Sequence, residues 1–211
     1  MKGILGSLTV VLFVASIAPP AGAVPIVLPR AGQVGFAVQG LYGGLTTAGN
    51  LGQEFGSGGT LAVRMIYRMR YERAIGLSFE ELRLGTRQAT ADSSGAFPAP
   101  APTFLPVARQ QLAVNTEGLD LYQYFGTRTK TPLYLNAGLG LAQVAATQVD
   151  GVTVYPLVPD GYYLSAGGGL ERFLYRSWAL DASVRYMAIL LDGSVNHDIH
   201  ACLGVVLYAA Y

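Results

Sequence analysis

Residues 178–187 read WALDASVRYM, and this stretch decides the fold class. Apolar or aromatic residues occupy every even position from Trp178 to Tyr186, while Asp181, Ser183 and Arg185 stand between them. A period of two predicts a β-strand with one apolar and one polar face. The rest of the sequence must then indicate which of the two faces meets water.

The composition of the chain is unusual for a soluble protein. Its 211 residues correspond to about one domain. Only 13% of them are charged, against about 25% in an average soluble domain, and the mean hydropathy is +0.36. The net charge of +1 gives no reason to expect a nucleic-acid partner. The single cysteine, Cys202, allows no disulfide within the chain.

Residues 1–23 have the pattern of a cleaved signal peptide. Lys2 precedes an apolar run at 4–18, and the small residues Ala21 and Ala23 occupy the −3 and −1 positions of a cleavage site. The alternative is a membrane anchor, but the run is shorter than the roughly 20 residues of a spanning helix. We therefore expect an exported chain with a signal peptide at 1–23 and one domain at 24–211.

Seven more stretches of the chain alternate in the same way. Including the first one, the eight segments are 34–42, 60–69, 74–80, 118–125, 133–142, 162–171, 178–187 and 201–211. In the fourth, Gln123 falls on the apolar side, so the register of that segment stays open. Short polar connections alternate with longer ones, and we count LDGSVNHDIH at 191–200 among the long ones. This predicts an all-β, up-and-down antiparallel sheet with two unlike ends.

The polar face of these segments combines small residues with isolated charges, which suits a narrow interior. The apolar face has almost no charge, which suits contact with hydrocarbon. Strands cross a bilayer only as a closed barrel, since every backbone polar group needs a partner there. We therefore predict an eight-stranded transmembrane β-barrel whose lumen holds a network of paired charges from Arg64, Arg68, Glu80, Asp120, Glu171, Asp181 and Arg185.

Aromatic residues lie near both ends of the segments, as in the two girdles of transmembrane barrels. A plainer interpretation is that Tyr and Trp are common in strands generally. We predict that the membrane-interface aromatics are Tyr42, Tyr67, Phe125, Tyr162, Trp178, Tyr186 and Tyr211.

Taken together, the mature chain resembles the small bacterial outer-membrane β-barrels of the eight-stranded OmpA/OmpX-like type. The resemblance rests on the AGA signal, the GLGLA, GGGLE and WALDASVRYM segments, and a last segment that ends on Tyr211. It implies a location in the cell outer membrane of a Gram-negative envelope, contact with outer-membrane lipid, and insertion machinery that recognises the C-terminal strand. It also implies a monomer.

Function is less constrained than fold, because one barrel serves many activities. We expect a structural, envelope-integrity or surface-interaction role, with an unknown loop ligand and no catalytic residue, metal or cofactor. The first alternative is a narrow small-solute pore, although side chains fill an eight-stranded lumen. The others are a lipid-modifying enzyme, a metal site and a secreted lipocalin-like binding barrel. The enzyme would use Ser194, His197, Asp198 and His200, and the metal site the last three of these.

Overall fold

The structure is a computed structural model that describes residues 28–86, 111–149, 152–154, 160–175, 177–191 and 193–209. Residues 1–23, the predicted signal peptide, lie outside this part of the chain, so that prediction stays untested. Among the described residues, no helix is both long and apolar enough to cross a membrane.

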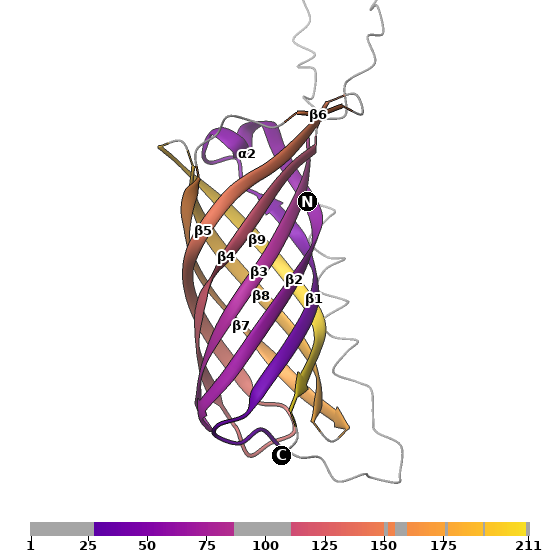
Figure 1. Ribbon diagram of the computed structural model, residues 1–211, viewed down its shortest axis with the longest axis vertical. Coiled ribbons are helices and arrows are strands. Elements are labelled where there is room, and N and C mark those ends of the chain that lie inside the picture. The colour runs from indigo at the N-terminus through magenta and orange to yellow at the C-terminus, as the bar shows by residue number, and fades with distance from the viewer. Residues whose placement is uncertain are drawn as a thin grey trace, which may run out of the picture.

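Eight long antiparallel strands form one closed ring (Figure 1). Each strand pairs with the next long strand along the chain, so β4 pairs with β5 and β5 pairs with β7. The pairing of β1 with β9 closes the ring. The three-residue strand β6 adds only to β5. The bounds are β1 Val34–Leu45, β2 Phe55–Arg70, β3 Arg73–Thr86, β4 Gln111–Phe125, β5 Leu133–Val149, β6 Val152–Val154, β7 Gly161–Tyr175, β8 Trp178–Leu191 and β9 Ser194–Tyr208. The predicted eight-stranded up-and-down barrel is confirmed.

The strands are strongly staggered around the ring. Register partners can be traced from strand to strand around the whole ring. The trace starts at Gly35 on β1, passes Asp120 on β4 and Asp198 on β9, and returns to β1 at Leu45. The shift from position 35 to position 45 is the shear of the barrel, and it tilts every strand away from the axis. Figure 1 shows this tilt.

The connections differ at the two ends of the barrel. At the short-turn end, β2–β3, β4–β5 and β7–β8 are joined by residues 71–72, 126–132 and 176–177. At the opposite end, which we call the loop end, β1–β2 contains the short helix α2 (Asn50–Glu54) and β5–β7 contains β6. The β3–β4 connection at 87–110 lies outside the described residues.

One predicted connection is wrong. Leu191 and Ser194 are register partners, so only residues 192 and 193 join β8 to β9, and residues 194–200 belong to the strand. The two linking residues are Asp-Gly, the pair preferred in two-residue hairpins, and Gly193 has a φ of 71°. The alternation of short and long connections therefore fails at this position.

The polarity of the two faces of the barrel wall is opposite to that of a soluble barrel. Large apolar side chains point outward and are exposed, including Phe36, Leu61, Leu139, Leu164 and Val184. Polar and charged side chains are buried inside, so the interior does not resemble the apolar cavity of a lipocalin-like barrel. The lipocalin-like alternative is therefore rejected, and the apolar outer wall suits a lipid bilayer.

The lumen contains apolar side chains at both of its ends. At the loop end, a loop-end cluster is formed by Leu45, Phe55, Leu82, Leu84, Leu112, Val114, Ala142, Tyr163, Met187, Ile189 and Leu191. At the short-turn end, a tyrosine-rich cluster contains Tyr122, Tyr124, Tyr134, Phe173 and Tyr208. The loop-end cluster was not predicted, although its members occupy inward positions of the alternating pattern.

Candidate functional site

The middle of the lumen holds the charged side chains that the sequence places on the polar face. All seven are buried, with at most 4% of any of them exposed. They come from five strands around the ring, with Arg64 and Arg68 on β2, Glu80 on β3, Asp120 on β4, Glu171 on β7, and Asp181 and Arg185 on β8. The tilt and stagger of the strands bring them together across the barrel axis.

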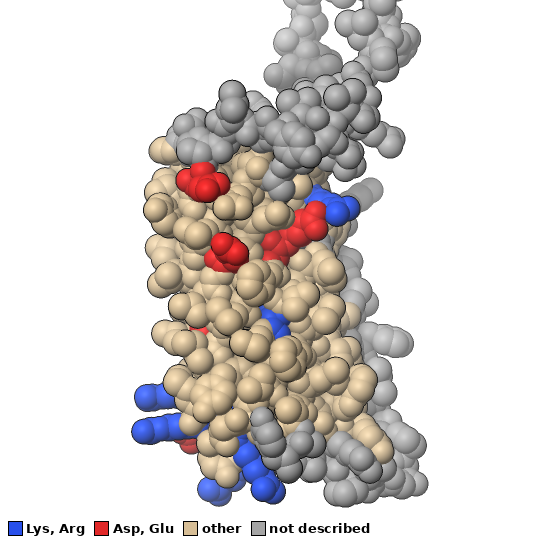
Figure 2. All heavy atoms as spheres, viewed as in Figure 1, with Lys and Arg blue, Asp and Glu red and all other residues tan. Residues whose placement is uncertain are grey.

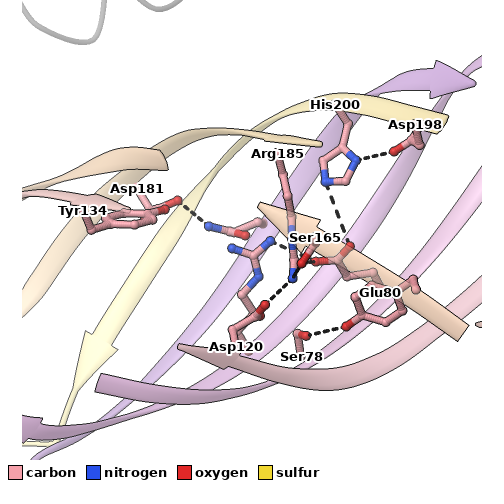
Figure 3. A network of polar contacts seen from close by, with 12 residues as sticks. Ser78, Glu80, Asp120, Tyr134, Ser165, Asp181, Arg185, Asp198 and His200 are labelled. Atoms are coloured by element: carbon pink, nitrogen blue, oxygen red, sulfur yellow. Dashed lines mark hydrogen bonds and ion pairs between the residues drawn. The ribbon is translucent and has the colours of Figure 1, made fainter. Parts of the chain in front are cut away.

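Arg185 is the centre of the first group of ion pairs (Figure 3). Its guanidinium forms ion pairs with Glu80 and Asp120 and donates a 2.9 Å hydrogen bond to Ser165. Glu80 also accepts from Arg64 at 2.9 Å. One arginine therefore connects β8 to β3, β4 and β7. Such fully desolvated charges are stable only when they are paired.

Glu171 is the centre of a second group, nearer the short-turn end. Arg68 Nη2 donates to its carboxylate at 2.9 Å, and the hydroxyls of Tyr124 and Tyr208 donate to it at 2.8 Å. The Arg68 guanidinium also lies 3.3 Å from the centre of the Tyr124 ring. The charge of Glu171 is thus balanced by one arginine and two phenols, with a cation–π contact to the same arginine.

Asp181 is held by neutral donors instead of an arginine among the contacts that the structure gives. The Tyr134 hydroxyl donates to it at 2.8 Å, and the Gln39 side-chain amide donates to its other oxygen. These two hydrogen bonds connect β8 to β1 and β5. Figure 3 shows Asp181 beside Tyr134.

Residues 194–200, which we considered as an enzyme or metal loop, form part of strand β9. Asp198 and His200 are buried in the lumen, where Nδ1 of His200 lies 2.5 Å from the Asp198 carboxylate. His197 lies on the outer face, where its Nδ1 is 2.5 Å from the Tyr186 hydroxyl. The alternation of the strand separates His197 from the other two, so the predicted three-residue metal site does not form. No metal-binding cluster of three such side chains occurs within the described ranges.

Sequence reasoning missed part of the lumen network. The members that it missed are one amide, five phenols, one carboxylate and one imidazole: Gln39, Tyr122, Tyr124, Tyr134, Tyr163, Tyr208, Asp198 and His200. Each stands at an inward position of the period-two pattern, which is the signal that could have found them. Three of the tyrosines, Tyr124, Tyr134 and Tyr208, donate their hydroxyls to buried carboxylates. The Tyr163 hydroxyl lies 3.4 Å from the Ser78 hydroxyl instead.

The aromatics predicted at the membrane interfaces lie on the outer wall. Tyr67, Phe125 and Trp178 stand near the short-turn end, while Tyr42, Tyr162 and Tyr186 stand toward the loop end, and all six are exposed. Tyr211 lies outside the described residues. Their position at the two membrane interfaces stays a prediction.

Comparison with solved structures agrees with this geometry. Neisserial surface protein A (NspA) matches with a TM-score of 0.59 and 16% sequence identity, over 82% of this chain and 96% of that one. The outer membrane protein OprG of Pseudomonas aeruginosa matches with a TM-score of 0.59 and 12% identity, over 89% and 100%. The chain has the fold of the bacterial outer-membrane β-barrels.

A third barrel of this fold is the N-terminal β-barrel domain of OprF from Pseudomonas aeruginosa. It matches with a TM-score of 0.56 and 15% identity, over 86% of this chain and 100% of that domain. No family model matches the sequence. The search of curated proteins also gave no match. The outer-membrane barrel fold is thus established by structure, at identities that carry no further detail.

Proposed function

We propose that this chain is an integral outer-membrane β-barrel with a structural or surface-interaction role. The observation that carries the proposal is the combination of an apolar outer wall with a lumen filled by paired charges and apolar clusters. The outer wall fixes the barrel in lipid, while the filled lumen makes it a rigid support for the loop end. The similar barrels are outer-membrane or surface proteins by name, which supports the same location.

The filled lumen disfavours the pore alternative. Arg64 and Arg185 are among the largest fully buried side chains of the chain, and both are held by carboxylates. Beyond them, the loop-end cluster closes the lumen with apolar side chains. An ion would have to displace both layers, because an eight-stranded interior is just wide enough for its own side chains. We therefore assign the lumen a bracing role and the loop end the contact with partners.

The enzyme alternative also loses its candidate residues. The two histidines of the 194–200 stretch lie on opposite faces of β9, so they cannot act on one substrate. The buried Asp198–His200 pair faces the lumen rather than the lipid, where a lipid-modifying enzyme would need its base. We propose a non-catalytic barrel on these grounds.

Two measurements test the proposal. After expression in a Gram-negative host, the chain should fractionate with the outer membrane and migrate faster on an unheated gel than on a heated one. Purified barrel in planar bilayers should give little or no steady ion current. Recovery in the soluble periplasmic fraction would contradict the location, and stable open channels would contradict the bracing role in favour of the pore.

A further inference from the structure

The outer wall of the barrel has a groove over strands β3, β4 and β5 near the short-turn end. Its volume is about 480 Å³, and much of its lining is apolar. The side chains that matter for its chemistry are Met69, Arg73, Leu121, Gln123, Leu135 and Ala137. A groove on this face opens toward lipid, since the wall around it is formed of exposed apolar side chains.

The register of the strands explains the shape of the groove. Arg73, Gln123 and Leu135 are partners in one row across β3, β4 and β5. In the next outward row, Leu121 is paired with Ala137. Ala137 is much smaller than the leucines beside it, so the wall is hollowed there. The groove therefore has a polar end at Arg73 and Gln123 and an apolar floor that runs toward the middle of the membrane.

The polar end of the groove lies in a basic part of the surface. The exposed cations at the short-turn end are Arg30, Arg70, Arg73, Arg128 and Lys130, against Glu72 as the exposed acid among the described residues there. Arg70 is the register partner of Arg73, so a second cation is paired with the one that lines the groove. Figure 2 shows Lys and Arg side chains gathered at the lower end of this face.

A second groove on the same wall has the opposite charge. It lies toward the loop end, has a volume of about 330 Å³, and is lined by Glu81 and Glu117 together with Phe79 and Leu61. Figure 2 shows acidic side chains in the upper half of this face. An anion would be attracted to the first groove and repelled by the second, so the two grooves differ in what they can hold.

We propose that the groove at Arg73 binds one anionic phospholipid from the leaflet at the short-turn end. Its phosphate would contact Arg73 and Gln123, and one acyl chain would lie along Leu121 and Ala137. An arginine presents several charged donors to a phosphate, and the two amide hydrogens of Gln123 leave one for the lipid beside its 3.4 Å contact with the Tyr124 carbonyl. The proposal rests on the barrel lying in a bilayer, as proposed above.

The experiment uses the full-length mature barrel in detergent, and native mass spectrometry counts the lipids bound to it. The probes are phosphatidylglycerol and phosphatidylethanolamine with identical acyl chains. We expect one tightly bound phosphatidylglycerol, with an affinity about tenfold above that for phosphatidylethanolamine. Glycerol phosphate should bind far more weakly than the lipid, because it lacks the chain that fills the groove.

Three variants locate the site. R73Q should remove the preference for the anionic lipid by deleting the charge at the groove. A137F should remove the tight binding by filling the hollow, without adding charge to the lipid-facing wall. R128Q is the matched control, since Arg128 is an exposed cation of the same end that does not line the groove. R128Q should leave the preference unchanged.

The outcomes separate this proposal from the proposed function. Three results would each contradict a specific lipid site in the groove. They are equal binding of both lipids by the unmodified barrel, unchanged phosphatidylglycerol binding by A137F, and a preference for phosphatidylglycerol that R128Q loses as fully as R73Q. The gel-mobility shift on heating is measured for each variant to check that it is folded. A failure of lipid binding leaves the membrane fractionation result untouched, so the location of the barrel is tested independently.

Discussion

At the scale of single residues, Arg185 and Arg83 form ion pairs in opposite surroundings, one buried and one exposed. Arg185 is buried in the lumen between Glu80 and Asp120, with 2% of its side chain exposed. Arg83 pairs with Glu81 at 2.8 Å on the outer wall, and 68% of its side chain is exposed. A buried ion pair that loses one partner leaves an uncompensated charge, whereas an exposed pair contributes little.

The loss of each arginine should therefore affect stability very differently. R185A should destabilise the barrel by about 3–5 kcal/mol, because Glu80 and Asp120 would keep buried charges without their shared partner. R83A should leave the stability almost unchanged, because the exposed pair with Glu81 contributes little. The measurement is the urea midpoint of unfolding in detergent, followed by the heat-dependent gel shift. Equal midpoints for the two variants would mean that water reaches the Arg185 site.

At the scale of one element, β8 carries both faces of the barrel. Val184 points outward in the middle of the strand and is exposed, while the neighbouring Arg185 points into the lumen. Leu190 points outward on the same strand but stands next to its loop end. The two outward positions therefore sample different depths of the membrane.

The depth difference predicts different effects for one substitution. V184R should cost roughly 2–4 kcal/mol, because it places a charge near the bilayer midplane. L190R should cost about 0–1 kcal/mol, because its charge reaches the interface. The two variants are compared by their free energy of folding into liposomes. Equal costs at the two positions would contradict the placement of Val184 in the middle of the membrane.

The elements also show how much of the structure the sequence could predict. Alternation assigned the two faces of residues 178–186 of β8 correctly, because the large apolar side chains of that stretch stand only at even positions. Residues 194–200 alternate in the same way, but the polar Asn196, Asp198 and His200 give the segment the composition of a loop. In a barrel with a polar lumen, that alternation is typical of a strand, and the Asp-Gly pair before it was the turn.

The pairing of the charges could not be predicted from the sequence, for a physical reason. Which arginine meets which carboxylate depends on the register of all eight strands and on the stagger of ten positions around the ring. A shift of one residue in a single strand would turn its side chains to the other face. Composition therefore predicts a lumen network, while its actual contacts, such as Asp181 with Gln39 and Tyr134, require the three-dimensional structure.

At the scale of the whole molecule, the two unlike ends predict an orientation. Transmembrane barrels of bacteria have short periplasmic turns and longer extracellular loops. We expect the loop end at the cell surface, including the 87–110 connection, and the short-turn end in the periplasm. A tag at position 99 should be labelled on intact cells, while a cysteine in place of Lys130 should react only after the outer membrane is permeabilised. Labelling of position 130 but not of position 99 on intact cells would contradict this orientation.

The closure of the ring between β1 and β9 also determines the order of events when the chain is made. Gly35 pairs with Tyr208, so the first strand has to wait for the last one before its second edge is covered. Until then, the growing chain carries an open strand edge and an outer wall that water does not favour. Contacts between such distant parts of a chain form slowly. The newly made protein therefore depends on being kept unfolded during its transit, and becomes stable in a single late step.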